Sequence, residues 1–181
     1  MRLLILRLLS LACLVGIAAC SSNVVLDHSA GAPVYQYSGE KYGKVEVKWS
    51  DEVGADAVKV YRIKQMALDK AVINRLIANR LYDPAAANSM EVRINSFSFR
   101  NSFNAVMFGF MAGSDSLDGV VSLKAADGRA LTHFDVSASY ALGGSNGGNA
   151  DTRMGWLSDK FGELTAQTIL NKPQPGQDAS R

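Results

Sequence analysis

The residues best suited to acid–base chemistry are His133 and Asp135, two positions apart in a segment that alternates like a β-strand. This spacing places both side chains on one face, where a proton could pass between them and a substrate. No nucleophile is spaced to join them, and the only other histidine, His28, lies far earlier in the chain. We therefore expect no catalytic residues and no enzymatic activity.

Two segments contain residue types found in ligand-binding loops. Asp115-Ser116-Leu117-Asp118-Gly119 has acids like a calcium loop, but their spacing and the missing closing Glu argue against one, so we predict a turn before a strand. Residues 143–149, GGSNGGN, could present backbone N–H groups to an anion, but they lack the Lys of a P-loop. We predict a plain connection there, with a small-molecule or glycan site as the alternative, and neither a cofactor nor a metal.

The first 20 residues, MRLLILRLLSLACLVGIAAC, have the order of a secretory signal. Arg2 and Arg7 make a positive start, and the apolar stretch from Leu8 to Ala19 covers twelve residues. That is well short of the roughly 20 residues that a transmembrane helix needs. The sequence therefore predicts a signal peptide rather than a membrane-spanning helix.

The end of this segment, Leu14-Val15-Gly16-Ile17-Ala18-Ala19-Cys20, resembles the lipobox of bacterial lipoproteins, with Ile17 where a Leu is usual. The resemblance implies cleavage before Cys20, diacylation of its thiol and acylation of the new N-terminus. Three acyl chains would anchor a protein almost permanently. Ser21, rather than an Asp, follows the cysteine, which favours sorting to the outer membrane, facing the periplasm.

The mature chain is near neutral and long enough for one domain. Cleavage would remove 19 of the 181 residues and leave 162, and would lower Lys+Arg from 19 to 17, equal to the 17 Asp+Glu. This balance argues against nucleic-acid binding. We expect residues 1–19 to be the signal peptide, 20–42 a lipidated tether, 43–172 a single α+β periplasmic domain and 173–181 a disordered tail. Tyr35, Tyr37 and Tyr42 could instead add an edge strand or lie near the membrane interface.

Four segments predict the sheet. Lys44 to Trp49 alternates cleanly, and Glu91 to Arg100 alternates with a change of phase that a bulge near Asn95 and Ser96 would reconcile. Gly119–Ala125 and Leu131–Leu142 flank Asp127-Gly128, which predicts a hairpin with a type I′ turn. In Leu131–Leu142, the second strand of this hairpin, we expect the even-numbered residues to face the core and the odd-numbered residues His133 to Ser139 to face solvent.

Two segments predict helices. Residues 63–82 should form a helix whose main apolar stripe includes Ile73, Ile77 and Leu81, while Leu68, Val72 and Leu76 form a second row that either a loop or a partner protein covers. Thr152–Leu170 should form a closing helix with Asp151 as its N-cap and a buried stripe. The stripe consists of Met154, Leu157, Phe161, Leu164, Thr165 and Thr168. Together these elements predict an α+β two-layer sandwich, a mainly antiparallel sheet with two principal helices on one side.

The C-terminal half, with Gly119-Val120-Val121-Ser122-Leu123, Asp127-Gly128, a Gly-rich loop and an amphipathic helix, resembles uncharacterised families of small bacterial lipoproteins known only as domains of unknown function. The resemblance implies a compact periplasmic domain and no functional residue beyond Cys20. We expect a membrane-anchored envelope protein that binds a protein partner through the long helix or the apolar run Ala105–Ala112, for which burial in the core is the simpler role. A small-molecule or glycan binder is the alternative, and a cell-envelope hydrolase is less favoured.

Overall fold

The computed structural model describes residues 23–26, 35–51, 53, 65–100, 113–141 and 149–171. Cys20, His28, the apolar run Ala105–Ala112, most of the loop 143–149 and the predicted tail 173–181 lie outside the described residues. The predictions made for those five features therefore stay predictions.

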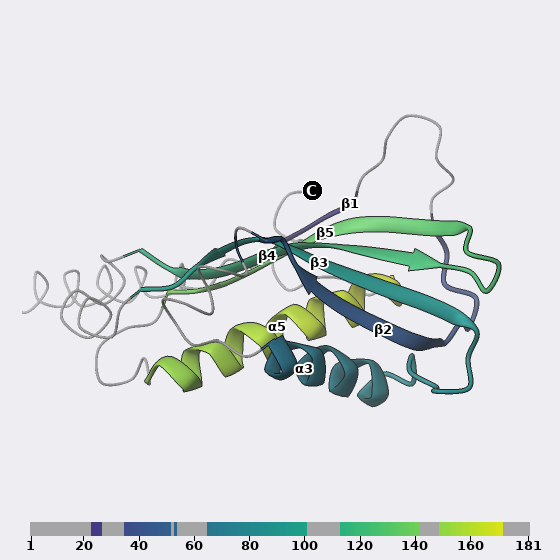
Figure 1. Ribbon diagram of the computed structural model, residues 1–181, viewed down its shortest axis with the longest axis horizontal. Coiled ribbons are helices and arrows are strands. Elements are labelled where there is room, and N and C mark those ends of the chain that lie inside the picture. Colours follow the sequence, from purple (N-terminus) through teal and green to yellow (C-terminus); the bar gives the residue numbers. More distant parts are fainter. Residues whose placement is uncertain are drawn as a thin grey trace, which may run out of the picture.

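The domain is a five-stranded sheet with two helices on one face (Figure 1). The strands are β1 (Asn23–Leu26), β2 (Tyr42–Trp49), β3 (Asn88–Ser98), β4 (Asp115–Lys124) and β5 (Ala130–Tyr140), in the spatial order β1-β5-β4-β3-β2. Only β2 and β3 are parallel, and the helices are α3 (Gln65–Ala78) and α5 (Ala150–Ile169). The predicted α+β architecture, with a mainly antiparallel sheet and helices on one side, is confirmed.

Alternation along the strands sorts side chains between the helices and the open face. In β5, Phe134, Val136, Ala138 and Tyr140 are buried, whereas His133 and Asp135 are exposed. β2 follows the same rule, since Val47 is buried while Lys44 and Lys48 are exposed. Both predicted strand faces are confirmed, because one face of an antiparallel sheet can stay in water.

The bulge predicted in β3 is present. The pairing with β4 shifts between Ile94, which pairs with Gly119, and Ser96, which pairs with Asp118. The inserted residue lets Val92 and Ile94 before the bulge, and Phe97 and Phe99 after it, all pack into the core.

The hairpin between β4 and β5 forms, but its turn differs from the predicted one. The Ala125 N–H donates to the Arg129 carbonyl and the Gly128 N–H donates to the Ala125 carbonyl, both at 2.9 Å. Only Gly128 has a positive φ, at 84°, whereas a type I′ turn would require one at Asp127 as well. The loop has three residues, and a left-handed glycine at its end returns the chain to the strand.

The predicted buried face of the long helix is wrong. Leu68, Val72 and Leu76 are completely buried, whereas Ile77, assigned to the main apolar stripe, is 52% exposed. The row treated as secondary is the one that faces the sheet and α5. A helix with apolar residues on two sides offers two possible burial faces, and tertiary packing selects between them.

Helix α3 ends earlier than predicted, and its end is closed by a Schellman motif. Arg80 has a φ of 60°; its N–H donates to the Ile77 carbonyl at 3.0 Å, and the Leu81 N–H donates to the Leu76 carbonyl at 2.8 Å. The chain then passes through a bridge between Tyr82 and Tyr42 into the turn that leads to β3. The helix therefore stops at Ala78 and not at Asp83-Pro84.

Helix α5 begins two residues before the predicted start, and its N-cap is Asn149 rather than Asp151. The Asn149 side chain accepts a hydrogen bond of 2.9 Å from the Thr152 N–H, which satisfies one of the free donors of the first turn. Asp151 lies within that turn, where a negative charge is favoured. The predicted buried stripe is confirmed in full: Met154, Leu157, Phe161, Leu164, Thr165 and Thr168 are buried.

The segment before β2 contributes structure where a tether was predicted. β1 pairs antiparallel with β5, from Asn23 opposite Ser137 to Leu26 opposite Phe134. Further along, Tyr42 is fully buried, and its hydroxyl lies 3.1 Å from that of the partly buried Tyr35. An edge strand is therefore present at residues 23–26, where the sequence predicted a tether and the alternative edge strand was assigned to the tyrosines instead.

Candidate functional site

Three charged side chains are buried together where β3 and β5 end and β4 begins, next to the first turn of α5. They are Asp115, which is 0% exposed, Arg153, which is 1% exposed, and Arg100, which is 8% exposed. Asp115 begins β4, so the turn predicted at 115–119 is wrong and the segment is strand. We call these three residues the charge cluster.

Arg100 forms hydrogen bonds to Asp115 through both its backbone N–H and its side chain. The Arg100 backbone N–H and Nε donate to Oδ1 of Asp115 at 2.8 and 3.2 Å, and its Nη2 donates to Oδ2 at 3.2 Å. The same Nη2 also donates to the Tyr140 carbonyl at 3.0 Å. Arg100 therefore links the end of β3 to the start of β4 and the end of β5.

Arg153 brings α5 into the same cluster. Its Nη1 lies 3.2 Å from Oδ2 of Asp115, and its Nη2 donates to the Arg100 carbonyl at 2.9 Å. Its guanidinium also stands 4.5 Å from the centre of the Phe99 ring, a cation–π arrangement. Within the described part of the chain, Nε of Arg153 has no hydrogen-bond partner.

The contacts indicate what the cluster can do. Both carboxylate oxygens of Asp115 are engaged by arginines, so its role is to hold neighbouring elements and not to accept a proton from a substrate. Two guanidinium groups face this one carboxylate among the described residues, which makes Asp115 the only negative charge shared by two buried cations. Breaking such a group on one side leaves an uncompensated charge.

Little in the amino-acid sequence predicts this cluster. Arg100 and Asp115 are 15 residues apart, and Arg153 and Arg100 are 53 apart, so no spacing rule brings them together. The available signal was the acid at position 115, immediately before an alternating strand, but that acid also fits a turn. Burial of the arginines depends on the path of β3 beyond its bulge.

The candidate acid–base pair lies on the open face of the sheet. His133 and Asp135 are both exposed, opposite Ser122 and Val120 of β4, so the structure keeps them on one face as predicted but in open solvent. Nearby, the Ser137 hydroxyl donates to the Asp118 carboxylate. These groups form part of the solvent-exposed face of the sheet.

The other half of the open face carries a small ion-pair network centred on Glu91. Its carboxylate lies 3.3 Å from Nζ of Lys48, 3.4 Å from Arg93 and 3.6 Å from Lys124. The hydrogen bond from Lys48 is the main reason why the pKa of Glu91 is lowered. Exposed pairs of this kind contribute little to stability.

The outward side of α3 presents the one large apolar side chain that is exposed in the described residues, Ile77. Around it lie exposed Asn74 and Lys70 and half-buried Ile73. The helix is fixed against α5 by a two-pronged contact, in which Nε of Arg75 donates to Oδ1 of Asp159 at 2.7 Å and Nη2 donates to Oδ2. The outward side of α3 is therefore held in a defined position.

Within the residues that the structure describes, no group of three or more His, Cys, Asp and Glu side chains is placed to hold a metal ion. The described helices include none that is both long and apolar enough to cross a bilayer.

The comparisons with known proteins identify a family and several similar folds. The model of a family described as a domain of unknown function, DUF4410, matches residues 53–144. No curated protein matches the chain.

Three solved structures are similar at low identity. The PelC dodecamer from Paraburkholderia phytofirmans is 10% identical, with a TM-score of 0.46, and the match covers 85% of this chain and 100% of that one. A minor lipoprotein from Acinetobacter baumannii is 14% identical, with a TM-score of 0.41 and coverage of 75% and 99%. A PDZ domain protein from Parabacteroides distasonis is 12% identical, with a TM-score of 0.37 and coverage of 90% and 40%.

Proposed function

This chain belongs to the DUF4410 family of domains of unknown function, and we propose that it is a lipid-anchored protein of the bacterial cell envelope that acts by binding another protein. In this proposal the anchor is Cys20, the location is the periplasmic face of the outer membrane, and the role is that of a non-enzymatic accessory component.

The anchor is supported by the leader sequence. A positive start, a short apolar stretch and small residues before Cys20 are the features that a lipoprotein signal requires. Ser21 after the cysteine supports outer-membrane sorting. Thioether-linked diacylglycerol and an N-terminal acyl chain together would hold the domain on the bilayer without a membrane-spanning helix.

The observation that carries the binding role is the exposure of Ile77 on α3. Burial of Ile77, which is 52% exposed, and of the half-buried Ile73 beside it against a partner would remove apolar surface from water and so would favour binding. The helix beneath it is already ordered by the buried row Leu68, Val72 and Leu76, so binding would require little reorganisation. The buried charges, in contrast, are engaged in holding the fold.

Mass spectrometry of the protein purified from native membranes tests the anchor. We expect the mature N-terminus to be Cys20 carrying three acyl chains, and we expect the Cys20→Ser variant to lose them and leave the membrane fraction. A mature N-terminus without acyl chains would refute the anchor.

Photocrosslinking in intact cells tests the binding role. A photoreactive residue in place of the exposed Lys70, on the same side of α3 as Ile77, should give a discrete crosslinked product with one protein. Ile77→Lys should abolish that product, whereas Ala78→Lys, an equally new charge at an exposed position of the same helix, should leave it. A product that survives Ile77→Lys, or the absence of any product, would contradict binding through this surface.

A further inference from the structure

The first strand begins almost at the proposed lipid attachment point. β1 starts at Asn23, and only Ser21 and Ser22 separate it from Cys20. We infer that the folded domain rests directly on the lipid head groups, with the end of the sheet where β5 terminates next to the bilayer and the β2 side turned away from it. This inference rests on the proposed acylation of Cys20.

The length of the connection limits how far the domain can stand from the membrane. Three residue steps from Cys20 to Asn23 span at most about 11 Å even when fully extended. The head-group layer on each side of a bilayer is itself about 5 to 7 Å thick. The start of β1, and therefore the part of β5 that it pairs with, must lie at the surface of the head groups.

The register between β1 and β5 indicates which part of the domain lies close to the lipid head groups. Asn23 pairs with Ser137, close to the C-terminal end of β5 at Tyr140. In the opposite direction, the seven residues back to Ala130 carry β5 about 24 Å away, to the hairpin.

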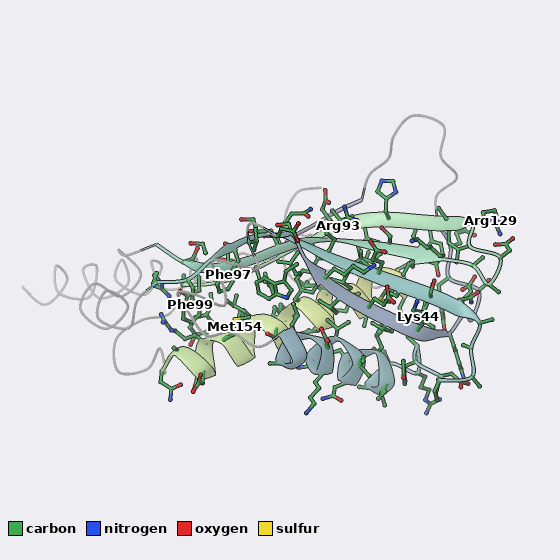
Figure 2. The ribbon with its side chains drawn as sticks, in the orientation of Figure 1. Lys44, Arg93, Phe97, Phe99, Arg129 and Met154 are labelled. Carbon is green, nitrogen blue, oxygen red and sulfur yellow. The ribbon has the colours of Figure 1, made fainter. Side chains whose placement is uncertain are left out.

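The two ends of the sheet differ in the kind of side chain that they carry. In Figure 2, Phe97, Phe99 and Met154 lie toward one end of the molecule, and Lys44 and Arg129 lie toward the other. β2 is at the opposite edge of the sheet from β1, and the turn that holds Ala87 adjoins β2 and the start of β3. Ala87 is therefore far from Asn23 in both directions, across the sheet and along the strands.

The partner in this inference is the bilayer itself, and the contact follows from chain length. Among the described residues, the open-face side chains of β5 around its pairing with Asn23 are Asp135, Ser137 and Ser139, and these supply no positive charge to attract anionic lipids. The domain would therefore be held at the surface by the shortness of its connection and by the hydrogen bonds of β1. Lengthening that connection should release it.

Fluorescence quenching on the full lipidated protein in phosphatidylethanolamine–phosphatidylglycerol vesicles tests the inference. Because Cys13 lies in the leader and Cys20 would be acylated, a single new cysteine can be labelled with a fluorophore. The paired variants are Ser139→Cys, near the start of β1, and Ala87→Cys, at the far corner. Lipids that carry a nitroxide in the head group act as the quencher.

We expect strong quenching of the label at position 139 and little at position 87. Insertion of a twenty-residue Gly-Ser linker between Ser22 and Asn23 should reduce quenching at 139 to the level seen at 87. Equal quenching at both positions, with acylation confirmed by mass spectrometry, would overturn the inference and leave the proposed anchor intact. Absence of acylation would overturn both.

Discussion

Gly162 of α5 lies so close to Ala71 of α3 that a Cβ at Gly162 would stand 3.1 Å from the Ala71 carbonyl oxygen. The Cα of Val72 and the Cγ of Arg75 are at the same distance. Two of these three neighbours are backbone atoms, which cannot move aside as the end of a long side chain can. The two helices therefore cross at a position where an added Cβ would make unusually tight contacts, and backbone atoms of α3 would have to move by a few tenths of an ångström to accept it.

We predict that Gly162→Ala lowers the free energy of unfolding by about 1 to 3 kcal/mol, because the added methyl group forces the two helices apart. Gly155→Ala is the matched control. It lies in the same helix with no atom within 4 Å of its added Cβ, and it should raise stability by roughly 0.5 to 1 kcal/mol through helix propensity. Urea denaturation measures both, and a neutral Gly162→Ala would contradict the close crossing.

Asp115→Asn should be far more damaging than the loss of one arginine of the charge cluster. The substitution keeps the size of the side chain but removes the carboxylate charge that Arg100 and Arg153 share, so we expect a loss of about 3 to 5 kcal/mol. Arg153→Met keeps the Arg100–Asp115 pair and removes one of the two cations that share the carboxylate, so its loss should be smaller. Equal losses in chemical denaturation would show that the carboxylate is not what holds the cluster together.

Arg80→Gly should stabilise the domain. Arg80 has a φ of 60° at the end of α3, a conformation that costs an ordinary residue about 1 kcal/mol and glycine almost nothing. We expect the melting temperature to rise in calorimetry. Asn79→Gly, one residue earlier, has no positive φ to relieve and should not raise it; a fall in melting temperature for Arg80→Gly would contradict the Schellman geometry.

The buried tyrosines at the start of β2 predict a loss of stability in alkaline solution. Burial raises the pKa of Tyr42, and burial also raises the pKa of its hydrogen-bonded neighbour Tyr35. Above about pH 10 the unfolded chain releases these protons while the folded chain retains them, so stability is complete below that pH and falls as the pH rises further.

Each of the two tyrosines can contribute a slope of up to about 1.4 kcal/mol per pH unit. Tyr42→Phe should lower stability at neutral pH by about 1 kcal/mol, through loss of the hydrogen bond to Tyr35, but should make the alkaline decline shallower. Urea midpoints at several pH values measure both effects. An unchanged alkaline slope in this variant would refute the assignment.

Period-two patterning was sufficient to predict β2, β3, β4 and β5, because burial of one face constrains each strand residue by residue, but it did not predict β1. It identified the two faces of β5 and even the bulge in β3, since Ser96 stands where an apolar residue was due. The turn after β4 was located correctly, but its type depends on one residue of loop length, which a dipeptide does not determine.

Helix α3 shows where sequence reasoning stops. Two apolar rows at helical spacing are equally consistent with burial, and the neighbours that select Leu68, Val72 and Leu76 come from the sheet and from α5. The charge cluster could not be predicted from the sequence for a related reason. Its members come from three elements, and nothing local to Arg100 or Arg153 distinguishes a buried arginine from a solvated one.

The bulge in β3 makes the packing of the residues after it depend on the number of residues in the strand more than on their types. Beyond it, Trp49 stands edge-on to Phe97 at 5.6 Å, and Phe97 stacks on Phe99 at 5.9 Å. Deleting the single inserted residue would move every later side chain of the strand to the opposite face of the sheet. Phe97 and Phe99 would then be exposed to solvent, and Arg153 would lose its cation–π contact with the Phe99 ring. One codon lost there would do more harm than most substitutions at the same positions.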